Sequence, residues 1–232
     1  MPQPSTRDPP PRGCETPLTA DPRPADDATG ASPAPAGWRA FLHDIDTLDR
    51  AVFATIVATP TPALDEPLRR LGRAADRSKL WFGTAAALAA LGGRRGRRAA
   101  LVGLVSLGTA SATVNLAVKY GAMRPRPERP VVDDGRHLPM PRSSSFPSGH
   151  SASAFAFAVA AGNQVPVLAL PLNAAAGLVA YSRVHTGVHY PSDVVAGSAI
   201  GGAVGTIVRS SLLWGLGRRA ARHRHAAATP AS

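Results

Sequence analysis

The chain is 232 residues long, a length that fits one domain with a tail. It carries 26 basic and 15 acidic residues, a formal net charge of +11, which suits nucleic acid, anionic lipid or phosphate ligands. The arginines cluster at the ends of apolar runs and form no basic stripe with interleaved aromatics, which argues against nucleic acid. Cys14 is the single cysteine, which excludes a disulfide framework or a cysteine metal site within one chain.

Three regions follow from the composition. Residues 1–36 are rich in Pro, Asp, Ala and Thr without apolar periodicity, and we expect a disordered tail there. This segment lacks the basic start and apolar centre of a signal peptide. Residues 37–217 are expected to form a helical domain, because Ala, Gly and other small residues dominate their apolar stretches. Residues 218–232 are expected to form a basic polar tail.

The apolar runs predict helices that cross a membrane. Ala99 to Val118 is 20 residues without a charge, the length that a bilayer-spanning helix needs. Ser151 to Ser182 is 32 residues without a charge, but Gly162 to Pro166 interrupts it and predicts two helices with a tight turn. Three further runs are shorter: Ala51–Leu64, Leu80–Gly93 and Val194–Val208. We expect an all-α, membrane-embedded bundle of about four to six helices. A soluble helical bundle is the alternative, since several runs fall below ~18 residues.

Basic residues predict how the bundle is oriented. The sequence GRRGRR (Gly93 to Arg98) separates two apolar runs, and RRAARHR follows the last run. If both are cytoplasmic, as the positive-inside tendency favours, the loops Lys119–His150 and Ser182–Asp193 share the outer side. The segment Arg69–Lys79 would then also lie outside despite its five basic residues, against that tendency.

Three polar segments each lie at the mouth of an apolar run, so one fold can bring them together: KYGAMRPRP (119–127), SSSFPSGHS (143–151) and SRVHTGVHYPSD (182–193). A phosphate ester needs several fixed positive donors, which Lys119, Arg126 and Arg183 can supply. Pro147-Ser148-Gly149 before an apolar run predicts a turn that opens a helix, whose N-terminus favours an anion. Ser148 adds a hydroxyl donor, and Gly149 lets the backbone approach closely.

The histidines of these segments suit phosphoryl transfer. A histidine that attacks phosphorus must present one neutral ring nitrogen, while an acceptor holds the other. Asp193 follows His189 by four residues and is the only acidic residue from Gly135 onward, so we predict this pair as nucleophile and orienting acceptor. His150, when protonated, can donate to the leaving oxygen as general acid. Arg124 and His185 are expected to be an ordinary loop charge and a bystander.

The set of motifs resembles the type 2 phosphatidic acid phosphatase (PAP2) superfamily, which includes the vanadium haloperoxidases. The family pattern K-x6-RP, PSGH and SR-x5-H-x3-D is matched by Lys119 to Pro127, Pro147 to His150 and Ser182 to Asp193. The sequence around PSGH is similar to that of actinobacterial members. The resemblance implies a phosphohistidine at His189, His150 as proton donor, no cofactor and no required metal. It also implies a multi-pass protein of the cytoplasmic membrane whose site faces the outer side.

The leading functional hypothesis is therefore a phosphatase for a membrane lipid phosphate, either phosphatidic acid or a polyprenyl phosphate or diphosphate. Its expected partners are the lipid substrate and the bilayer, with no nucleic acid. A haloperoxidase is one alternative, because vanadate in the same pocket mimics the transition state of phosphoryl transfer. A non-catalytic protein that binds lipid phosphates is the other, although binding alone needs no nucleophile.

Overall fold

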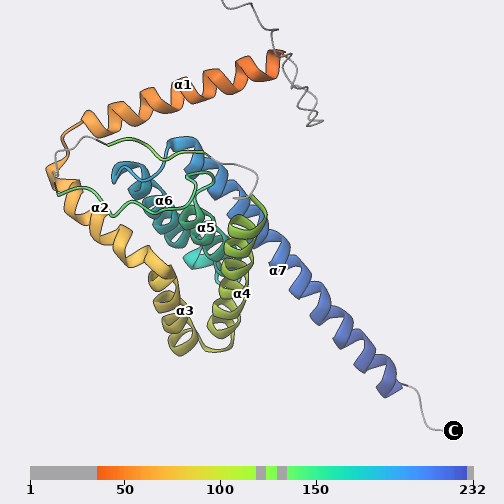
Figure 1. The fold of residues 1–232 in the computed structure, drawn as a ribbon. Coiled ribbons are helices and arrows are strands. Elements are labelled where there is room, and N and C mark those ends of the chain that lie inside the picture. Colours follow the sequence, from red (N-terminus) through yellow and green to blue (C-terminus); the bar gives the residue numbers. More distant parts are fainter. Residues whose placement is uncertain (1–35, 119–123, 130–134, 229–232) are drawn as a thin grey trace, which may run out of the picture.

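The computed structural model describes residues 36–118, 124–129 and 135–228 (Figure 1). This part of the chain is all-helical, as predicted. The longer helices are α1 (Ala36–Ala58), α2 (Pro62–Ala75), α3 (Lys79–Leu91), α4 (Gly93–Ala112), α5 (Gly149–Gly162), α6 (Ala169–His185) and α7 (Pro191–Ala228). Three short segments extend them: η1 (Asp76–Ser78), the π-helical η2 (Thr113–Val118) and η3 (Pro166–Leu168). Helix α7 continues into the segment expected as a basic tail, and the regional boundaries proposed from composition stay predictions.

The predicted apolar runs correspond to helices of the bundle. The uncharged run Ala99–Val118 forms most of α4 and η2, and the run Ser151–Ser182 divides into α5 and α6 around residues 163–168, as expected. Within the described residues, three segments are long and apolar enough to cross a membrane: Gly93–Leu116, Pro166–His185 and Pro191–Leu212. These helices expose large apolar side chains, among them Leu101, Leu178 and Ile207, each more than half exposed. Such residues on the outside of a bundle are suited to lipid rather than water.

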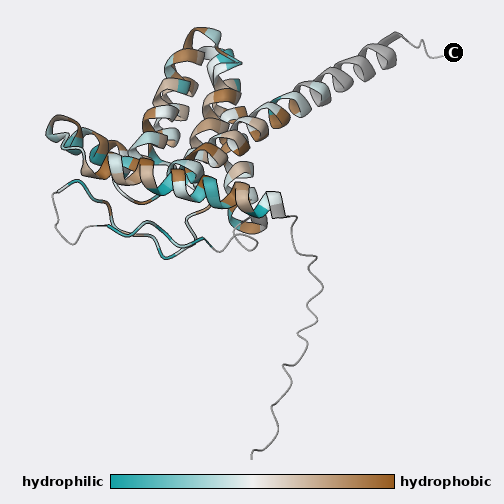
Figure 2. Ribbon diagram, turned by 90° about the horizontal axis from the view of Figure 1, so that it is seen from above, coloured by the Kyte–Doolittle hydropathy of each residue, from teal (hydrophilic) through white to brown (hydrophobic). Residues whose placement is uncertain are grey.

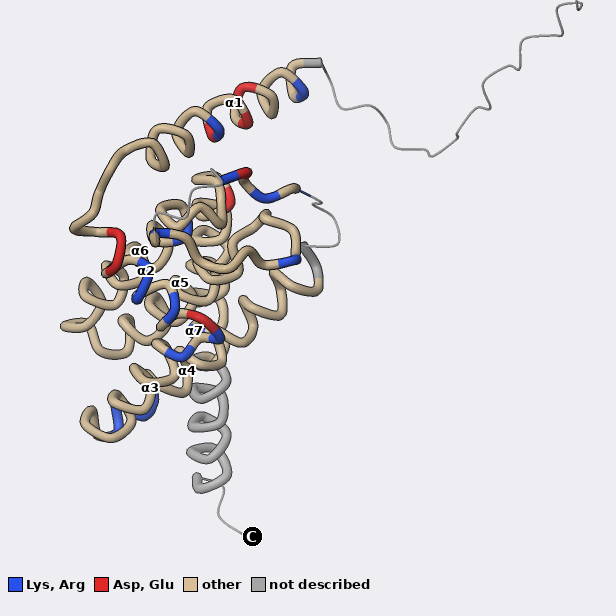
Figure 3. Tube along the Cα trace, turned by 60° about the vertical axis from the view of Figure 1, so that its left-hand side comes forward, with Lys and Arg blue, Asp and Glu red and all other residues tan. Residues whose placement is uncertain are grey.

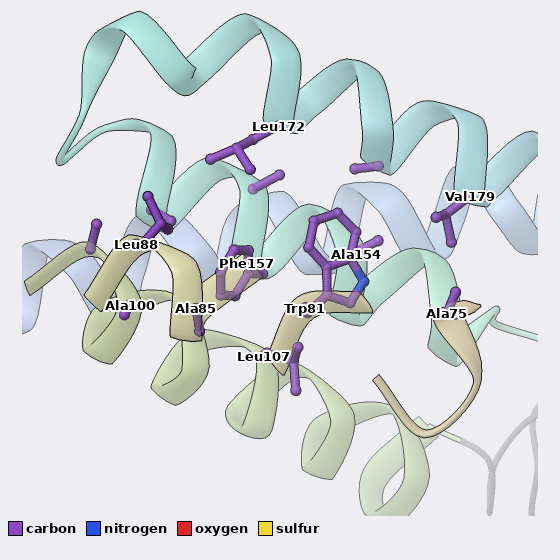
Figure 4. Packing of buried hydrophobic residues seen from close by; sticks show 14 residues of the cluster. Ala75, Trp81, Ala85, Leu88, Ala100, Leu107, Ala154, Phe157, Leu172 and Val179 are labelled. Carbon is purple, nitrogen blue, oxygen red and sulfur yellow. The ribbon is translucent and has the colours of Figure 1, made fainter. Parts of the chain in front are cut away.

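Helix α5 is the central element, because it packs against α4, α6 and α7. Its 14 residues span only about 21 Å at ~1.5 Å per residue, and most of them are buried small side chains. The core beside α5 is built on Trp81 and Phe157, whose ring centroids lie 5.3 Å apart (Figure 4). Gly103 of α4 faces the Phe157 ring so closely that a Cβ there would overlap it. Small residues thus allow the helices to approach closely around one aromatic pair.

A glycine ridge joins α7 to α5. Gly197, Gly201 and Gly205 are spaced four residues apart and lie on one side of α7. A Cβ at any of them would overlap the backbone of α5, at Ser148, Ala152 and Ala156 respectively. The backbone N–H of Ser148 also donates to the carbonyl oxygen of Asp193 over 2.9 Å. The ridge therefore holds the first turns of both helices, which carry two of the predicted motifs, directly against each other.

The two ends of the bundle differ in charge. The arginines of the α3–α4 turn lie at one end, and the loops of residues 124–129, 135–148 and 186–190 lie at the other, here called the loop end (Figure 3). Helix α1 crosses the loop end rather than following the bundle (Figure 1). The basic turn and the polar loops are therefore separated by the length of α4, as the charge pattern predicted.

Candidate active site

A cavity of about 210 Å³ opens at the loop end. Five of the residues predicted from the motifs line it: Arg126, Gly149, His150, Arg183 and His189. The structure thus brings all three motifs to one place. Lys119, the predicted third cation, lies outside the described residues. Trp81 and Asn115 complete the inner wall of the cavity, which connects the site to the aromatic core.

The PSGH motif opens α5 at the wall of the cavity. Gly149 is the first residue of α5 and lines the cavity, so the positive end of this helix points toward it. Ser148 is fully buried and caps the helix, because its Oγ accepts from the backbone N–H of Ser151 at 3.4 Å and from the Ser151 hydroxyl at 3.0 Å. The predicted turn and helix start are present. Ser148 itself is a cap beside the cavity lining, and its contact with phosphate stays a prediction.

His189 lies between the carboxylate of Asp193 and the guanidinium of Arg126. Its Nδ1 lies 3.5 Å from Oδ2 of Asp193, and its Nε2 lies 3.4 Å from Nη1 of Arg126. Burial lowers the pKa of His189, the positive charge of Arg126 acts in the same direction, and Asp193 opposes both. A neutral ring with its proton on Nδ1 satisfies both neighbours and leaves the Nε2 lone pair on the cavity side. This is the state that a nucleophilic histidine needs.

Asp193 makes two contacts from the start of α7. It is fully buried in the first turn of α7, and its Oδ2 accepts from the backbone N–H of Tyr190 over 2.9 Å. The same oxygen faces His189. The carboxylate is therefore fixed by the helix start and cannot turn away from the histidine ring.

Arg126 is positioned by the loop that follows it. Its Nη1 donates to the carbonyl oxygen of Val188 over 2.7 Å, and its Nε donates to that of Ser143 over 2.9 Å. Arg183 approaches from the last turn of α6 and donates to the carbonyl oxygen of Gly72 in α2. Each guanidinium is held by backbone atoms, so two fixed positive charges border one cavity. This arrangement is suited to an anionic ligand such as phosphate.

Sequence reasoning missed Asp76, which holds His150. Oδ1 of Asp76 lies 3.2 Å from Nε2 of His150 and 3.5 Å from Nη1 of Arg183. These contacts, first the hydrogen bond with His150 and then the charge of Arg183, hold the pKa of Asp76 below its usual range. Burial lowers the pKa of His150 and the charge of Arg183 acts in the same direction, whereas the hydrogen bond with Asp76 opposes both and favours the protonated ring that a general acid requires. Its sequence neighbours Arg77 and Ser78 both have left-handed backbone conformations, a feature that only the folded chain reveals.

The expectation that Arg124 is an ordinary loop charge was wrong. Its Nη1 donates to Oδ1 of Asp193 over 3.0 Å, and its Nη2 lies 2.7 Å from Oδ2 of Asp49 and 2.9 Å from Oδ1 of Asp46. The guanidinium also lies over the Tyr190 ring, 4.3 Å from its centroid. Arg124 thus joins α1 to the carboxylate that orients His189. Asp46 and Asp49 lie 75 or more positions before Arg124 in the chain, so local spacing could not reveal these contacts.

His185 lies apart from the cavity, in agreement with its expected role as a bystander. Its Nε2 lies 2.9 Å from Oδ1 of Asp65 in α2, and Nε of Arg136 contacts the same oxygen over 2.9 Å. Arg136 also donates to the backbone carbonyls of Val57, in the last turn of α1, and of Thr59, between α1 and α2. This group ties the loop end to the N-terminal helices.

The comparisons with known proteins agree with this geometry. The family model described as the PAP2 superfamily matches residues 99–214, which include the cavity-lining motifs PSGH and SR-x5-H-x3-D. The chain belongs to the PAP2 superfamily. The assignment expected from the motifs is confirmed, together with the membrane-embedded helical fold.

The chain is similar to two relatives in sequence and to two solved structures in fold. It is 34% identical over 184 residues to a decaprenylphosphoryl-5-phosphoribose phosphatase of Mycobacterium tuberculosis, over 75% of this chain and 97% of the relative. A lipid A 1-phosphatase of Rhizobium etli is 47% identical over 58 residues, a quarter of each chain. The transmembrane PAP2 phosphatidylglycerolphosphate phosphatase of Bacillus subtilis superposes with a TM-score of 0.56 at 25% identity, over 74% of this chain and 88% of that structure. Aquifex aeolicus LpxE shares the fold, with a TM-score of 0.55 at 24% identity over 69% of this chain and 94% of that structure.

Proposed function

We propose that this PAP2 protein hydrolyses the phosphate ester or anhydride of a membrane lipid through a phosphohistidine at His189, without a metal. The observation that carries the proposal is the placement of His189. One ring nitrogen faces the buried Asp193, while the other faces a cavity lined by three arginines and a second histidine. Relatives whose names describe phosphatases for lipid phosphates support the same reaction class.

The reaction needs two displacements at phosphorus. In the first, Nε2 of His189 attacks phosphorus, the bond to the leaving oxygen breaks, and protonated His150 gives that oxygen its proton. Asp193 stabilises the positive charge that develops on the His189 ring. In the second, neutral His150 takes a proton from water, the water oxygen attacks phosphorus, and the bond to His189 breaks. Arg126, Arg183 and the start of α5 stabilise the charge on the phosphoryl oxygens in both steps.

The substrate class follows from where the cavity lies. It opens at the end of a bundle whose spanning helices expose apolar side chains, so a substrate with its chain in the bilayer can present a phosphate there. The named relatives act on a polyprenyl phosphoribose and on lipid A. We infer a lipid phosphate of the polyprenyl or phosphatidic acid type.

The test is release of inorganic phosphate by the purified protein in detergent. The panel comprises phosphatidic acid, a polyprenyl phosphate, a polyprenyl diphosphate and a water-soluble aryl phosphate, each with and without a chelator. We expect release from at least one lipid, no loss with the chelator, and inhibition by orthovanadate. Strict dependence on added magnesium would contradict the mechanism. Bromide oxidation by peroxide and vanadate, without phosphate release, would favour the haloperoxidase hypothesis instead.

We further propose that the loop end faces the outer side of the cytoplasmic membrane. Four arginines lie at the start of α4, at the end of the bundle opposite to the loop end, and this favours a cytoplasmic position for that basic end. Single cysteines replace Arg142 at the loop end and Arg95 at the start of α4, both exposed, in a Cys14→Ser background. A membrane-impermeant thiol reagent should label only the first in intact cells. Labelling of only the second would place the site in the cytoplasm.

A further inference from the structure

Helix α1 carries an apolar stripe that the bundle does not cover. Its members are separated by one, three or four positions along the helix, and each is between 38% and 65% exposed: Trp38, Phe41, Leu42, Ile45, Leu48 and Val52. This spacing places them on one side of the helix. The rings of Trp38 and Phe41 stack with centroids 5.4 Å apart. So many large apolar residues on one exposed face indicate a partner for that face.

The bundle occupies a different side of α1. Asp46 and Asp49 contact Arg124, and the ring of Phe53 packs edge-on against that of Tyr190 at 5.4 Å. At about 100° per residue, this side lies next to the apolar stripe, and a third side carries exposed polar residues such as His43 and Thr47. The helix therefore presents one side to the protein, one to an apolar environment and one to water.

The direction of α1 decides between two apolar environments. It runs across the direction of α3 and α4 in Figure 1, at the loop end of the bundle, and Figure 2 shows both hydrophilic and hydrophobic residues along it. Asp44, Asp46, Asp49 and Arg50 lie in its middle, which excludes it as a membrane-spanning helix. A helix that crosses the direction of the spanning helices at one end of the bundle fits a position along the membrane surface rather than across the bilayer.

We propose that α1 is an interfacial helix that binds the bilayer surface at the loop end, with its apolar stripe in the acyl boundary and its polar side in water. Two observations favour lipid as the occupant. The stripe is at the same end as the first turn of α7, whose Val195 is 67% exposed, so the lipid-facing surface of the bundle reaches the level of α1. Aromatic residues at the start of the stripe are typical of the membrane–water boundary.

This placement has a consequence for the site. Asp46 and Asp49 reach from α1 to Arg124, which holds Asp193. Binding of α1 to the bilayer would therefore fix Asp46 and Asp49, and through them Arg124 and Asp193 beside His189. The inference requires only that the bundle is in a membrane, and it is independent of the proposed reaction.

The test measures the environment of α1 directly in proteoliposomes of phosphatidylethanolamine and phosphatidylglycerol. Nitroxide labels are attached to single cysteines that replace Ile45 or Leu48 on the stripe, and His43 or Thr47 on the polar side, in a Cys14→Ser background. Collision rates are then measured with oxygen, which concentrates in lipid, and with a nickel chelate, which stays in water. We expect the ratio of oxygen to nickel collisions to be several-fold higher at 45 and 48 than at 43 and 47.

Two results would overturn the inference. Equal and high nickel accessibility at all four positions would place α1 in water. Protection of positions 45 and 48 from both reagents, with spectral broadening that disappears on dilution with unlabelled protein, would assign the stripe to a second copy of the chain. Phosphate release from the same labelled samples is scored separately. Loss of the proposed activity leaves the accessibility pattern intact, and a failed accessibility pattern leaves the activity result standing.

Discussion

Two buried histidines lie four residues apart, each beside an aspartate and each with an arginine on that aspartate. Nε2 of His185 lies 2.9 Å from Asp65, and Nδ1 of His189 lies 3.5 Å from Asp193. Both rings are at most 4% exposed. The pairs differ in what the structure places beside the second ring nitrogen. Nε2 of His189 faces Arg126 at the cavity of the loop end, whereas His185 is not among the residues that line this cavity.

The comparison teaches that a buried histidine–aspartate pair is not by itself a nucleophile. The shorter contact belongs to the pair without access to substrate, and it connects helices α2 and α6. The longer contact belongs to the pair at the cavity. Access of the second nitrogen to an anion site, rather than the strength of the carboxylate contact, distinguishes a catalytic from a structural pair.

The largest expected effect separates the two rings themselves. His189→Ala should lower kcat by at least ~10⁴-fold, because the attacking nitrogen is removed. His185→Ala should keep kcat within about tenfold in the folded protein but lower the free energy of unfolding by about 2 kcal/mol, since Asp65 loses a buried partner. Phosphate release and chemical denaturation in detergent measure the two quantities. Equal loss of kcat in both folded variants would remove the distinction.

The second effect separates the two carboxylates. Asp193→Asn should lower kcat by about 10²- to 10⁴-fold, because an amide can neither fix the Nδ1–H tautomer nor stabilise the imidazolium. Asp65→Asn should leave kcat nearly unchanged and reduce stability. The control is near-wild-type binding of vanadate by Asp193→Asn, which shows that the anion site is intact. Full activity of Asp193→Asn would show that His189 needs no orienting acceptor.

A smaller effect concerns Arg124, the arginine that contacts Asp193 of the His189–Asp193 pair. Arg124→Gln should lower kcat by about 10- to 100-fold with little change in KM, the usual size for a group that orients another catalytic side chain. Arg142→Gln is the matched control, because Arg142 is an exposed cation of the same loop end. A rise in KM with unchanged kcat would instead make Arg124 a substrate ligand.

The smallest effect is on pH dependence. Burial lowers the pKa of His189, so the neutral, attacking form persists below the ordinary histidine pKa of about 6.5. The acid limb of kcat/KM should therefore fall at a pH below about 6.5, and Asp193→Asn should move it lower still, because the carboxylate that favours the charged ring is gone. Stopped assays between pH 4.5 and 8 check this. An acid limb above pH 7 would contradict a desolvated nucleophile.

Much of the site could be predicted because its residues are close in sequence and on helix ends. Arg183 lies in the last turn of α6, His189 in the loop that follows and Asp193 in the first turn of α7, so local spacing already fixes their neighbourhood. Gly149 and His150 begin α5, which packs against α6 and α7. The charge pattern placed the loops Lys119–His150 and Ser182–Asp193 at the same end of the bundle.

The missed residues are those whose partners are distant in the chain. Asp76 reaches His150 across 74 positions, and Asp49 lies 144 positions before Asp193, to which it is joined through Arg124. Nothing in local composition distinguishes these acids from ordinary surface charges, because their environment is created by tertiary packing. The glycine ridge of α7 likewise has a meaning only against the backbone of α5.

Trapping of the phosphoenzyme tests the central claim most directly. The protein is mixed with a ³²P-labelled lipid phosphate and quenched in alkali within milliseconds to seconds, and the label is located by fragmentation of the tryptic peptide that follows Arg183, which carries both histidines. We predict an acid-labile, alkali-stable label on His189 that is absent from His189→Ala and present in His185→Ala. A label on His185, or one that persists in His189→Ala, would contradict the account.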